Sequence, residues 1–417
     1  MPTNPGKPGK ACMDAAAGMV YGDSSSKEVW QGEWKMKSDQ FTGTIPLPGS
    51  EHVDVGILAR LFEDRTNSYK FFFFLAILER IADSAQGLAA GLDRPIPLSE
   101  LAVDMVLAAW YPHGFCRLSF GPQDMLQQAV DSIEWGPVRG SWIQSDSEEW
   151  QRLRKTCAGQ LDTSTLVRYV PYRLIRPFFS KETAGLRDDL VNAKIAELAE
   201  NALVGHTTPY CFTGDRQSLI LDHEWLAYFL TNNAILRGWT RFKLAEYLQA
   251  RNPNSAGIVV KLSPPLVRES LSRQTEWWSQ ALPILGDAGR CIYTGTRLSP
   301  LDFSLDHYLP WSFVAHNRDW NLVPVSRNIN STKSDRIPDN CHISALAHLQ
   351  HAGIEVMAKT LPRTRWLKSV EPFMIDLHLD PEALLDRNTL LRAYEDTLRP
   401  LSAIAERQGF EGGWKYK

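Results

Sequence analysis

The sequence predicts a mainly α protein with a small α+β unit embedded in its last third. Apolar residues recur with helical spacing in several stretches between residues 51 and 285, and again after residue 341. The stretch 291–338 instead suits a short strand, loops and a short helix around a set of polar residues. A chain of 417 residues is long enough for two or three domains.

The composition is that of an ordinary globular protein, with 44% hydrophobic and 22% charged residues. The longest apolar run, residues 71–78, stops at Glu79 and is too short to cross a membrane. The N-terminus lacks the basic-then-apolar pattern of a secretion signal, so we expect a cytoplasmic protein. Because the net charge is −3, a nucleic-acid-binding function requires local basic patches or a partner that brings the substrate.

Residues 1–50 are rich in Gly, Pro, Ser and Lys, and they carry the isolated Trp30 and Trp34. Such a segment buries little apolar surface, so we expect a flexible N-terminal tail. The alternative is a partner-binding arm that uses the two tryptophans.

Residues 51–145 are expected to form a helical domain, with helices over 55–62, 69–82, 98–110 and 122–133. Apolar residues surround the whole axis of the second helix, which predicts burial on nearly all sides. Its four phenylalanines, residues 71–74, could be imagined as a base-stacking platform. Consecutive residues on a helix point in different directions, so a core helix is the better interpretation.

Residues 146–285 form a second, more basic helical region, which ends in a helix that carries Trp277 and Trp278. The stretch from Trp150 to Lys181 contains seven basic residues and one acidic residue, and a second basic group spans 237–273. These groups are candidates for binding a phosphate backbone or a partner. The alternative is a solvated surface balanced by the acidic stretch 182–200. Residues 258–262 are predicted to form a short strand between two proline-containing turns.

The polar residues of the stretch 291–338 carry the chemistry. Asp306 and His307 are adjacent, so on a strand their side chains point to opposite faces. A neutral His307 imidazole can take a proton from water near pH 7, while Asp306 offers an oxygen ligand to a cation. We expect Ser326 to cap a helix over 327–334, on which Asn330 and Lys333 lie three positions apart on one face.

These side chains suit hydrolysis of a phosphodiester, which needs a base for water and a hard divalent cation. Asn330 supplies a second oxygen ligand, and oxygen-only ligation favours Mg²⁺ or Mn²⁺ over zinc. Lys333 can reach a phosphate as a point charge. Asn321 can tie the loop behind His307 and so hold the imidazole in position.

This stretch resembles the HNH, or ββα-metal, endonuclease family. Its spacing from His307 to Asn321 and Asn330, followed by Lys-Ser-Asp at 333–335, is similar to the HNH domain of the RNA-guided CRISPR nuclease. The resemblance covers about 50 residues and rests on elements that occur in the family's order. It implies that Asp306 and Asn330 bind the metal, that His307 is the general base and that Asn321 orients it.

The predicted fold class is therefore mainly α with a small embedded α+β (ββα-metal) nuclease finger at 286–340, followed by C-terminal helices over 341–417. We expect helices at 342–357 and 382–404, joined by a connection that contains Pro and Trp. The predicted catalytic residues are His307, Asn321 and Lys333, with Mg²⁺ as cofactor and Mn²⁺ as its substitute. The residues expected to contact nucleic acid are Lys333, Arg336, Arg327 and Arg268.

No structural zinc is expected. Many HNH domains carry two CxxC pairs, whereas Cys291 is followed three positions later by Thr294, and Cys341 has no cysteine nearby. The six cysteines are scattered, which predicts buried small apolar residues in a reducing compartment.

The histidines outside the motif are assigned no chemistry. His52, His113, His206 and His223 show no ligand-like spacing. His316 lies in the loop of the finger, where a structural or exposed role is favoured over a phosphate contact.

The sequence therefore predicts a metal-dependent endonuclease that acts on DNA. By analogy at the level of the fold, a helical body with an HNH finger and no motor motif suggests a bacterial restriction or anti-phage defence effector with an activating signal or protein partner. The alternatives are a non-cleaving nucleic-acid-binding or assembly subunit, a homing or recombination nuclease, and a degenerate inactive copy. One finger makes one cut, so a double-strand break requires a homodimer or successive nicks.

Overall fold

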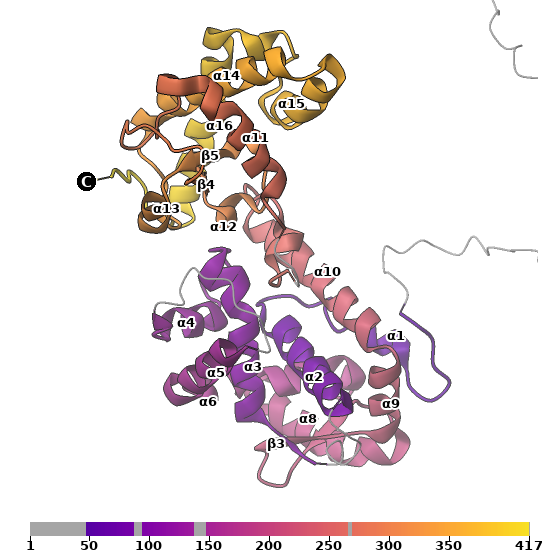
Figure 1. Ribbon diagram of the computed structural model, residues 1–417. Coiled ribbons are helices and arrows are strands. Elements are labelled where there is room, and N and C mark those ends of the chain that lie inside the picture. The colour runs from indigo at the N-terminus through magenta and orange to yellow at the C-terminus, as the bar shows by residue number, and fades with distance from the viewer. Residues whose placement is uncertain (1–46, 87–93, 137–146, 266–268, 417) are drawn as a thin grey trace, which may run out of the picture. The chain divides into compact units, whose positions relative to one another are not determined.

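The computed structural model describes residues 47–86, 94–136, 147–265 and 269–416 (Figure 1). Trp30, Trp34, Cys12 and Arg268 lie outside the described residues. Helices dominate the described chain, together with two small antiparallel sheets, so the predicted fold class is confirmed. None of the described helices has both the length and the apolar character of a membrane span.

The first hydrophobic core extends from Val53 to Leu262. The two stretches that the sequence analysis treated as separate helical regions both contribute to it. Its helices are α1 (Val55–Leu58), α2 (Tyr69–Gln86), α3 (Leu98–Ala109), α4 (Met125–Ser132), α5 (Glu148–Gln160), α6 (Thr163–Val167), α7 (Val170–Ile175), α8 (Asp188–Ala202), α9 (His223–Thr231) and α10 (Asn233–Arg251).

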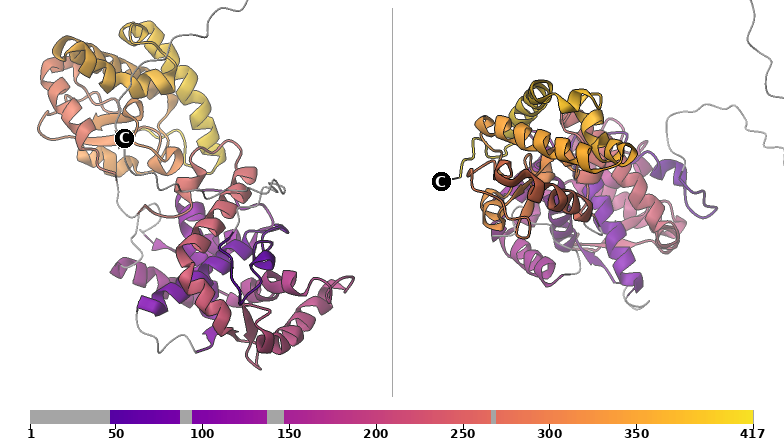
Figure 2. Two further views of the ribbon diagram at one scale, coloured as in Figure 1. Left: turned by 90° about the vertical axis from the view of Figure 1, so that its right-hand side faces the viewer. Right: turned by 45° about the horizontal axis from the view of Figure 1, so that its top comes forward.

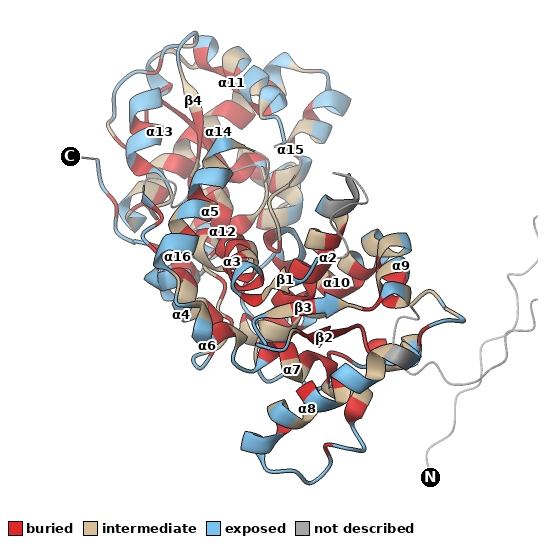
Figure 3. Ribbon diagram, turned by 90° about the horizontal axis from the view of Figure 1, so that it is seen from below, coloured by how far each residue is buried: buried red, intermediate tan, exposed pale blue. Residues whose placement is uncertain are grey.

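Helix α2 lies at the centre of this core, where it packs against α3 and α10. Its four consecutive phenylalanines are at most 2% exposed, which confirms the core interpretation of residues 71–74. Figure 3 shows the buried positions in red. Full burial of a phenylalanine contributes about 1.5 to 3 kcal/mol of transfer free energy, so this one turn of helix is a major source of stability.

A three-stranded antiparallel sheet completes the first core, in the order β1 (Ile96–Pro97), β3 (Ser218–Leu221) and β2 (Tyr210–Phe212). Strand β3 leads directly into α9 through Asp222, whose side chain caps that helix. The sequence analysis placed no strands here, because segments of two to four residues are too short for an alternating pattern to emerge.

The strand predicted over 258–262 is wrong. Ile258–Lys261 form a 3₁₀ turn, preceded by Gly257 at a φ of 67°. Val259 and Val260, the β-branched residues that suggested a strand, are 72% and 50% exposed. Neither belongs to a sheet of the described chain.

The second hydrophobic core extends from Trp278 to Trp414. Helix α14 packs against both α11 and α16 (Figures 1 and 2). The elements of this core are α11 (Ser272–Leu285), β4 (Ser304–His307), α12 (Trp311–Val314), β5 (Leu322–Val325), α13 (Arg327–Lys333), α14 (Ile343–Thr360), α15 (Arg363–Leu377) and α16 (Arg387–Arg407).

The C-terminal helices agree with the prediction in part. Helices α14 and α16 are the two that we expected, although a 3₁₀ turn at Ala383–Leu385 precedes α16. The connection between them contains an additional helix, α15, which the sequence analysis missed. Pro362 stands at its N-cap and Pro372 inside it, and this second proline is a residue that normally argues against a helix interior.

Strands β4 and β5 pair antiparallel, with Asp306 opposite Val323 and His307 opposite Leu322. Helix α13 follows β5 and packs against β4. This β4–β5–α13 arrangement is the expected ββα finger, and α12 lies in the long connection between its two strands.

The buried Lys261 and the partly buried Arg117 link residues of the two cores. Lys261 Nζ donates to the Ser255 hydroxyl at 3.0 Å and to the Phe313 carbonyl at 2.5 Å. Arg117 donates to Asp335 at 2.9 Å and to the Gly409 carbonyl at 2.6 Å. The finger is therefore anchored to residues far from it in the sequence.

Candidate active site

Strand β4 divides the Asp306–His307 pair between its two faces. Asp306 is 2% exposed, whereas His307 is half-buried. This is the alternation that a pleated strand imposes on neighbouring residues. One face of the strand therefore presents a carboxylate to the protein interior, and the other presents an imidazole.

The Asp306 carboxylate has a strong hydrogen-bond donor on each oxygen. Tyr293 donates its hydroxyl to Oδ2 at 2.8 Å, and Lys333 Nζ lies 3.1 Å from Oδ1. Burial raises the pKa of Asp306, and the positive charge of Lys333 opposes that rise. Tyr293, to which the sequence analysis assigned no chemistry, thus takes part in holding this carboxylate.

Lys333 occupies a different place from the one predicted. Its side chain is fully buried on the face of α13 that packs on β4, and Nζ also donates to the His307 carbonyl at 2.6 Å. A lysine enclosed in this way is a partner of Asp306 and of the strand backbone. In this arrangement the ammonium does not reach a phosphate at the surface.

Asn317 and Glu269 fix the tautomer of His307. His307 Nε2 lies 2.8 Å from Asn317 Oδ1, and Asn317 Nδ2 donates to Glu269 at 2.9 Å. Because a carboxylate only accepts, the NH₂ group of Asn317 must face Glu269 and its oxygen must face the imidazole. His307 Nε2 therefore carries the proton, and Nδ1 is the nitrogen with a basic lone pair.

Asn321 is fully buried and ties down the loop after His307. Its side chain accepts from the Leu309 amide at 2.8 Å and donates to the Leu309 carbonyl at 2.9 Å. Its own carbonyl accepts from the Tyr308 amide at 2.8 Å. Asn321 therefore lies behind His307 as expected, and its hydrogen bonds hold the backbone of Tyr308 and Leu309, the two residues after His307.

Asn330 lies on α13 and binds the backbone of β4. Its Nδ2 donates to the Leu305 carbonyl at 3.1 Å and contacts the Ser304 hydroxyl at 3.3 Å. These bonds orient the amide, and Oδ1 accepts no hydrogen bond from any residue that the structure describes. The amide is therefore anchored to the backbone of the residue that precedes Asp306.

The predicted metal ligands Asp306 and Asn330 carry oxygen donors of the type that a hard divalent cation prefers. A carboxylate on β4 and an amide oxygen on α13 lie on adjoining elements, and Mg²⁺ or Mn²⁺ prefers such oxygens together with water. The ammonium of Lys333 supplies the positive charge beside Asp306 in this structure. A bound cation would have to share the carboxylate with this ammonium or displace it.

A comparison with known protein families identifies this region. Residues 291–339 match the model of the HNH endonuclease family. The chain carries an HNH endonuclease domain. No curated protein and no solved structure matches the chain significantly. The match supports a nuclease that acts on nucleic acid, and HNH nucleases generally use divalent metal ions.

Many residues of the HNH domain lie in the second hydrophobic core. Cys291 is buried in the second core, but Cys341 is exposed, so the prediction that all the cysteines are buried is wrong for Cys341. Cys341 lies in a 3₁₀ turn capped by Asp339, whose carboxylate accepts from the Cys341 amide.

Ser326 is the N-cap residue of α13 as predicted, yet its side chain makes no capping hydrogen bond.

Two arginines of the HNH domain were expected to contact nucleic acid. Arg327 is exposed and forms a surface ion pair with Asp302 at 3.3 Å. Arg336 donates to the carbonyls of Lys333 and Thr332 at the end of α13, and its guanidinium lies over the Trp414 ring. Arg327 is therefore the one that remains accessible to a phosphate.

Some basic residues of the helical body form ion pairs, but among the seven between Trp150 and Lys181 only Arg154 and Arg173 pair with a described carboxylate. The phosphate-binding and solvated-surface interpretations of these regions therefore both stay predictions. The arginine ion pairs are Arg154–Asp104, Arg173–Asp188, Arg237–Glu79, Arg241–Glu79 and Arg273–Asp319.

A polar cavity of about 400 Å³ adjoins the His307–Asn317 contact. Burial lowers the pKa of His316, one of its lining residues, so this imidazole is neutral at pH 7. The cavity is lined by Glu269, Ser270, Arg273, Gln274, His316, Asn317, Arg318, Asp319 and Pro372. Except for His316, no pattern in the sequence singled out these residues for a place beside the HNH domain.

Proposed function

We propose that this protein is a metal-dependent endonuclease that hydrolyses DNA phosphodiester bonds, with Mg²⁺ as its cofactor and Mn²⁺ as a substitute. The observation that carries the proposal is the His307 imidazole, whose Nε2 proton is directed to Asn317 so that Nδ1 acts as the base. The oxygens of Asp306 and Asn330 support the choice of a hard cation.

In the proposed mechanism, His307 Nδ1 takes a proton from water, and the resulting hydroxide attacks the phosphorus. Nε2–H stays on Asn317 throughout, which stabilises the imidazolium that forms. Asn321 fixes the backbone after His307, while Asp306 and Asn330 would hold the cation. When bound, the cation supplies charge stabilisation for the phosphate and the departing 3′ oxygen. The P–O3′ bond breaks and the departing oxygen takes a proton from solvent, so the products are a 5′ phosphate and a 3′ hydroxyl.

A non-cleaving nucleic-acid-binding subunit is the second candidate. The Lys333–Asp306 ion pair favours it, because a fully buried ammonium stands beside the carboxylate that a catalytic cation would need. A restriction or anti-phage defence role is proposed for the nuclease on fold-level analogy alone.

Incubation of supercoiled plasmid with the full chain in Mg²⁺, Mn²⁺ or EDTA tests the proposal. A nuclease relaxes or linearises the plasmid in either metal and leaves it supercoiled in EDTA. An electrophoretic shift of the same plasmid that is equal in all three conditions, without cleavage, would instead support the binding subunit. A parallel reaction on single-stranded RNA tests the choice of DNA.

A further inference from the structure

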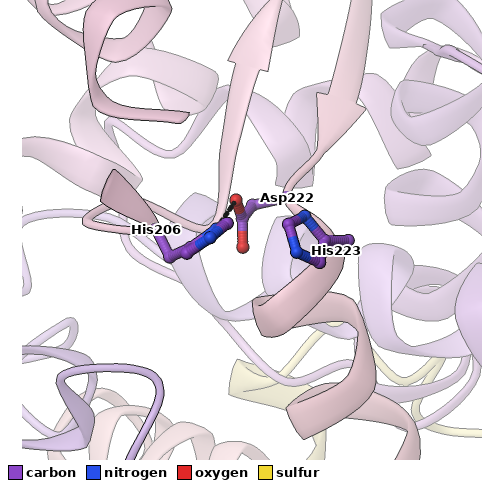
Figure 4. Close-up of side chains that lie close together, drawn as sticks. All are labelled: His206, Asp222 and His223. Atoms are coloured by element: carbon purple, nitrogen blue, oxygen red, sulfur yellow. Dashed lines mark hydrogen bonds and ion pairs between the residues drawn. The ribbon is translucent and has the colours of Figure 1, made fainter. Parts of the chain in front are cut away.

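Two histidines and an aspartate outside the HNH domain come together where β3 runs into α9 (Figure 4). One donor atom from each of His206, Asp222 and His223 lies within 4.8 Å of the other two. The two imidazole rings are 4.4 Å apart between centroids and nearly perpendicular, at 88°. The sequence analysis assigned nothing to these histidines, because their spacing matches no ligand motif.

Asp222 is a buried carboxylate that is held on both oxygens. It is 3% exposed, and Oδ1 accepts from the backbone amides of Glu224 and Trp225 at 3.0 Å each. Its other oxygen lies 2.7 Å from His206 Nδ1. The carboxylate therefore has a fixed orientation, with Oδ2 directed at the imidazole.

His206 has a constrained backbone conformation. This residue has a φ of 52°, in the left-handed region that costs a non-glycine residue energy. Its carbonyl accepts the indole N–H of the fully buried Trp225 at 2.9 Å. His223, the first residue of α9, has a side chain that is 74% exposed and supplies the open side of the cluster.

We propose that His206, Asp222 and His223 form a binding site for a divalent transition metal of the Zn²⁺ class. Imidazole nitrogens together with a carboxylate are the ligands that Zn²⁺ takes in proteins, at about 2.0 to 2.2 Å. Donor atoms around a tetrahedral ion at that distance lie about 3.3 Å apart. Metal binding would therefore bring the donor atoms closer together by about 1.5 Å at most. The exposed side chain of His223 is free to make this movement.

The two metal sites of this chain would then differ in chemistry. The oxygen donors Asp306 and Asn330 favour a hard cation, while two imidazoles favour a borderline one such as Zn²⁺. Zn²⁺ at the second site would clamp the segment before β2 to the N-terminus of α9.

Titration calorimetry of the full chain with Zn²⁺, in excess Mg²⁺ to occupy the HNH domain, tests this proposal. We expect one Zn²⁺ per chain in wild type and a loss of about tenfold or more in affinity in His223→Ala. His223 is exposed, so this variant keeps its fold. The melting temperature should rise with Zn²⁺ in wild type and stay unchanged in the variant.

His378→Asn is the matched control, because His378 is exposed and shares the left-handed backbone of His206, with a φ of 54°. Asparagine tolerates this conformation, and the same substitution at His206 tests the second ligand. His206 is supported as a ligand if Zn²⁺ affinity falls in His206→Asn and holds in His378→Asn. Absence of Zn²⁺ binding by wild type, or equal binding by all the variants, would overturn the proposal.

Discussion

At the scale of single residues, the reactivity of His307 depends on the orientation of one amide. Asn317 lies between the imidazole and Glu269, and its two hydrogen bonds select the Nε2–H tautomer. The imidazolium that forms when Nδ1 takes a proton keeps the same partner. Asn317 thus has the role of a positioning residue for the proposed base.

Asn317→Ala should lower the rate of DNA cleavage by about tenfold to a hundredfold, part of what a general base contributes. Metal affinity should be unchanged, because Asn317 touches neither Asp306 nor Asn330. The measurement is single-turnover cleavage across a pH series, in which the acidic limb of the profile should move as the imidazole loses its acceptor. A variant with a wild-type rate and pH profile would remove Asn317 from the mechanism.

Tyr293→Phe tests the support of the metal-binding carboxylate. Loss of the hydroxyl removes a hydrogen bond to Asp306 Oδ2, and bonds to charged groups are worth about 1.5 to 3 kcal/mol. We expect weaker Mn²⁺ binding in a titration. The control is Tyr308→Phe, because the buried Tyr308 hydroxyl has no partner among the described residues and its loss should cost little. Equal Mn²⁺ affinities in the two variants would contradict the role of Tyr293.

The residue-level predictions from the sequence are good where local geometry decides and poor where tertiary contacts decide. The opposite faces of Asp306 and His307 follow from the pleat of a strand alone. The pairing of Asn317 with Glu269 joins positions 48 apart in the sequence, and no local pattern connects them. The burial of Lys333 depends in the same way on how α13 packs on β4.

At the scale of elements, a 3₁₀ turn anchors the HNH domain through Lys261. Its fully buried ammonium bonds to the carbonyl of Phe313 in α12, and burial lowers the pKa of Lys261 to about 8. The unfolded chain therefore binds more protons than the folded protein between pH 8 and the ordinary lysine value of 10.5. The contribution of Lys261 to stability must rise with pH across this interval.

Lys261→Met should remove this pH dependence. Wild type should gain roughly 3 kcal/mol relative to the variant between pH 8 and 10.5, because each pKa unit corresponds to about 1.4 kcal/mol. Urea unfolding of both proteins at several pH values in this interval gives the difference directly. A difference in unfolding free energy that does not change with pH would show that Lys261 keeps an ordinary pKa.

Long elements with a strong period are predictable, whereas short or proline-containing ones are not. The apolar period identifies α2, α3, α14 and α16. The false strand at 258–262 arises because the left-handed turn at Gly257 exposes two valines that would otherwise suit a sheet. The sequence analysis missed helix α15 because this helix has a proline in its interior, which tertiary packing tolerates.

At the scale of the whole molecule, the net charge of −3 gives no overall attraction to DNA. Within the helical body Arg173, Arg237 and Arg241 pair with carboxylates. We infer that DNA binding is weak without a partner or an activating signal. If the further metal site exists, EDTA removes both cations. A loss of cleavage in EDTA is then attributed to the HNH domain only if Mg²⁺ alone restores cleavage.

The central claim is that His307 is the base of a metal-dependent nuclease. The most direct measurement is nicking of supercoiled plasmid in Mg²⁺ by wild type and His307→Ala, with Mn²⁺ and DNA binding measured on the same preparations. We predict that the variant loses cleavage by at least about a hundredfold while both binding affinities hold. Nicking by His307→Ala at the wild-type rate would contradict the mechanism.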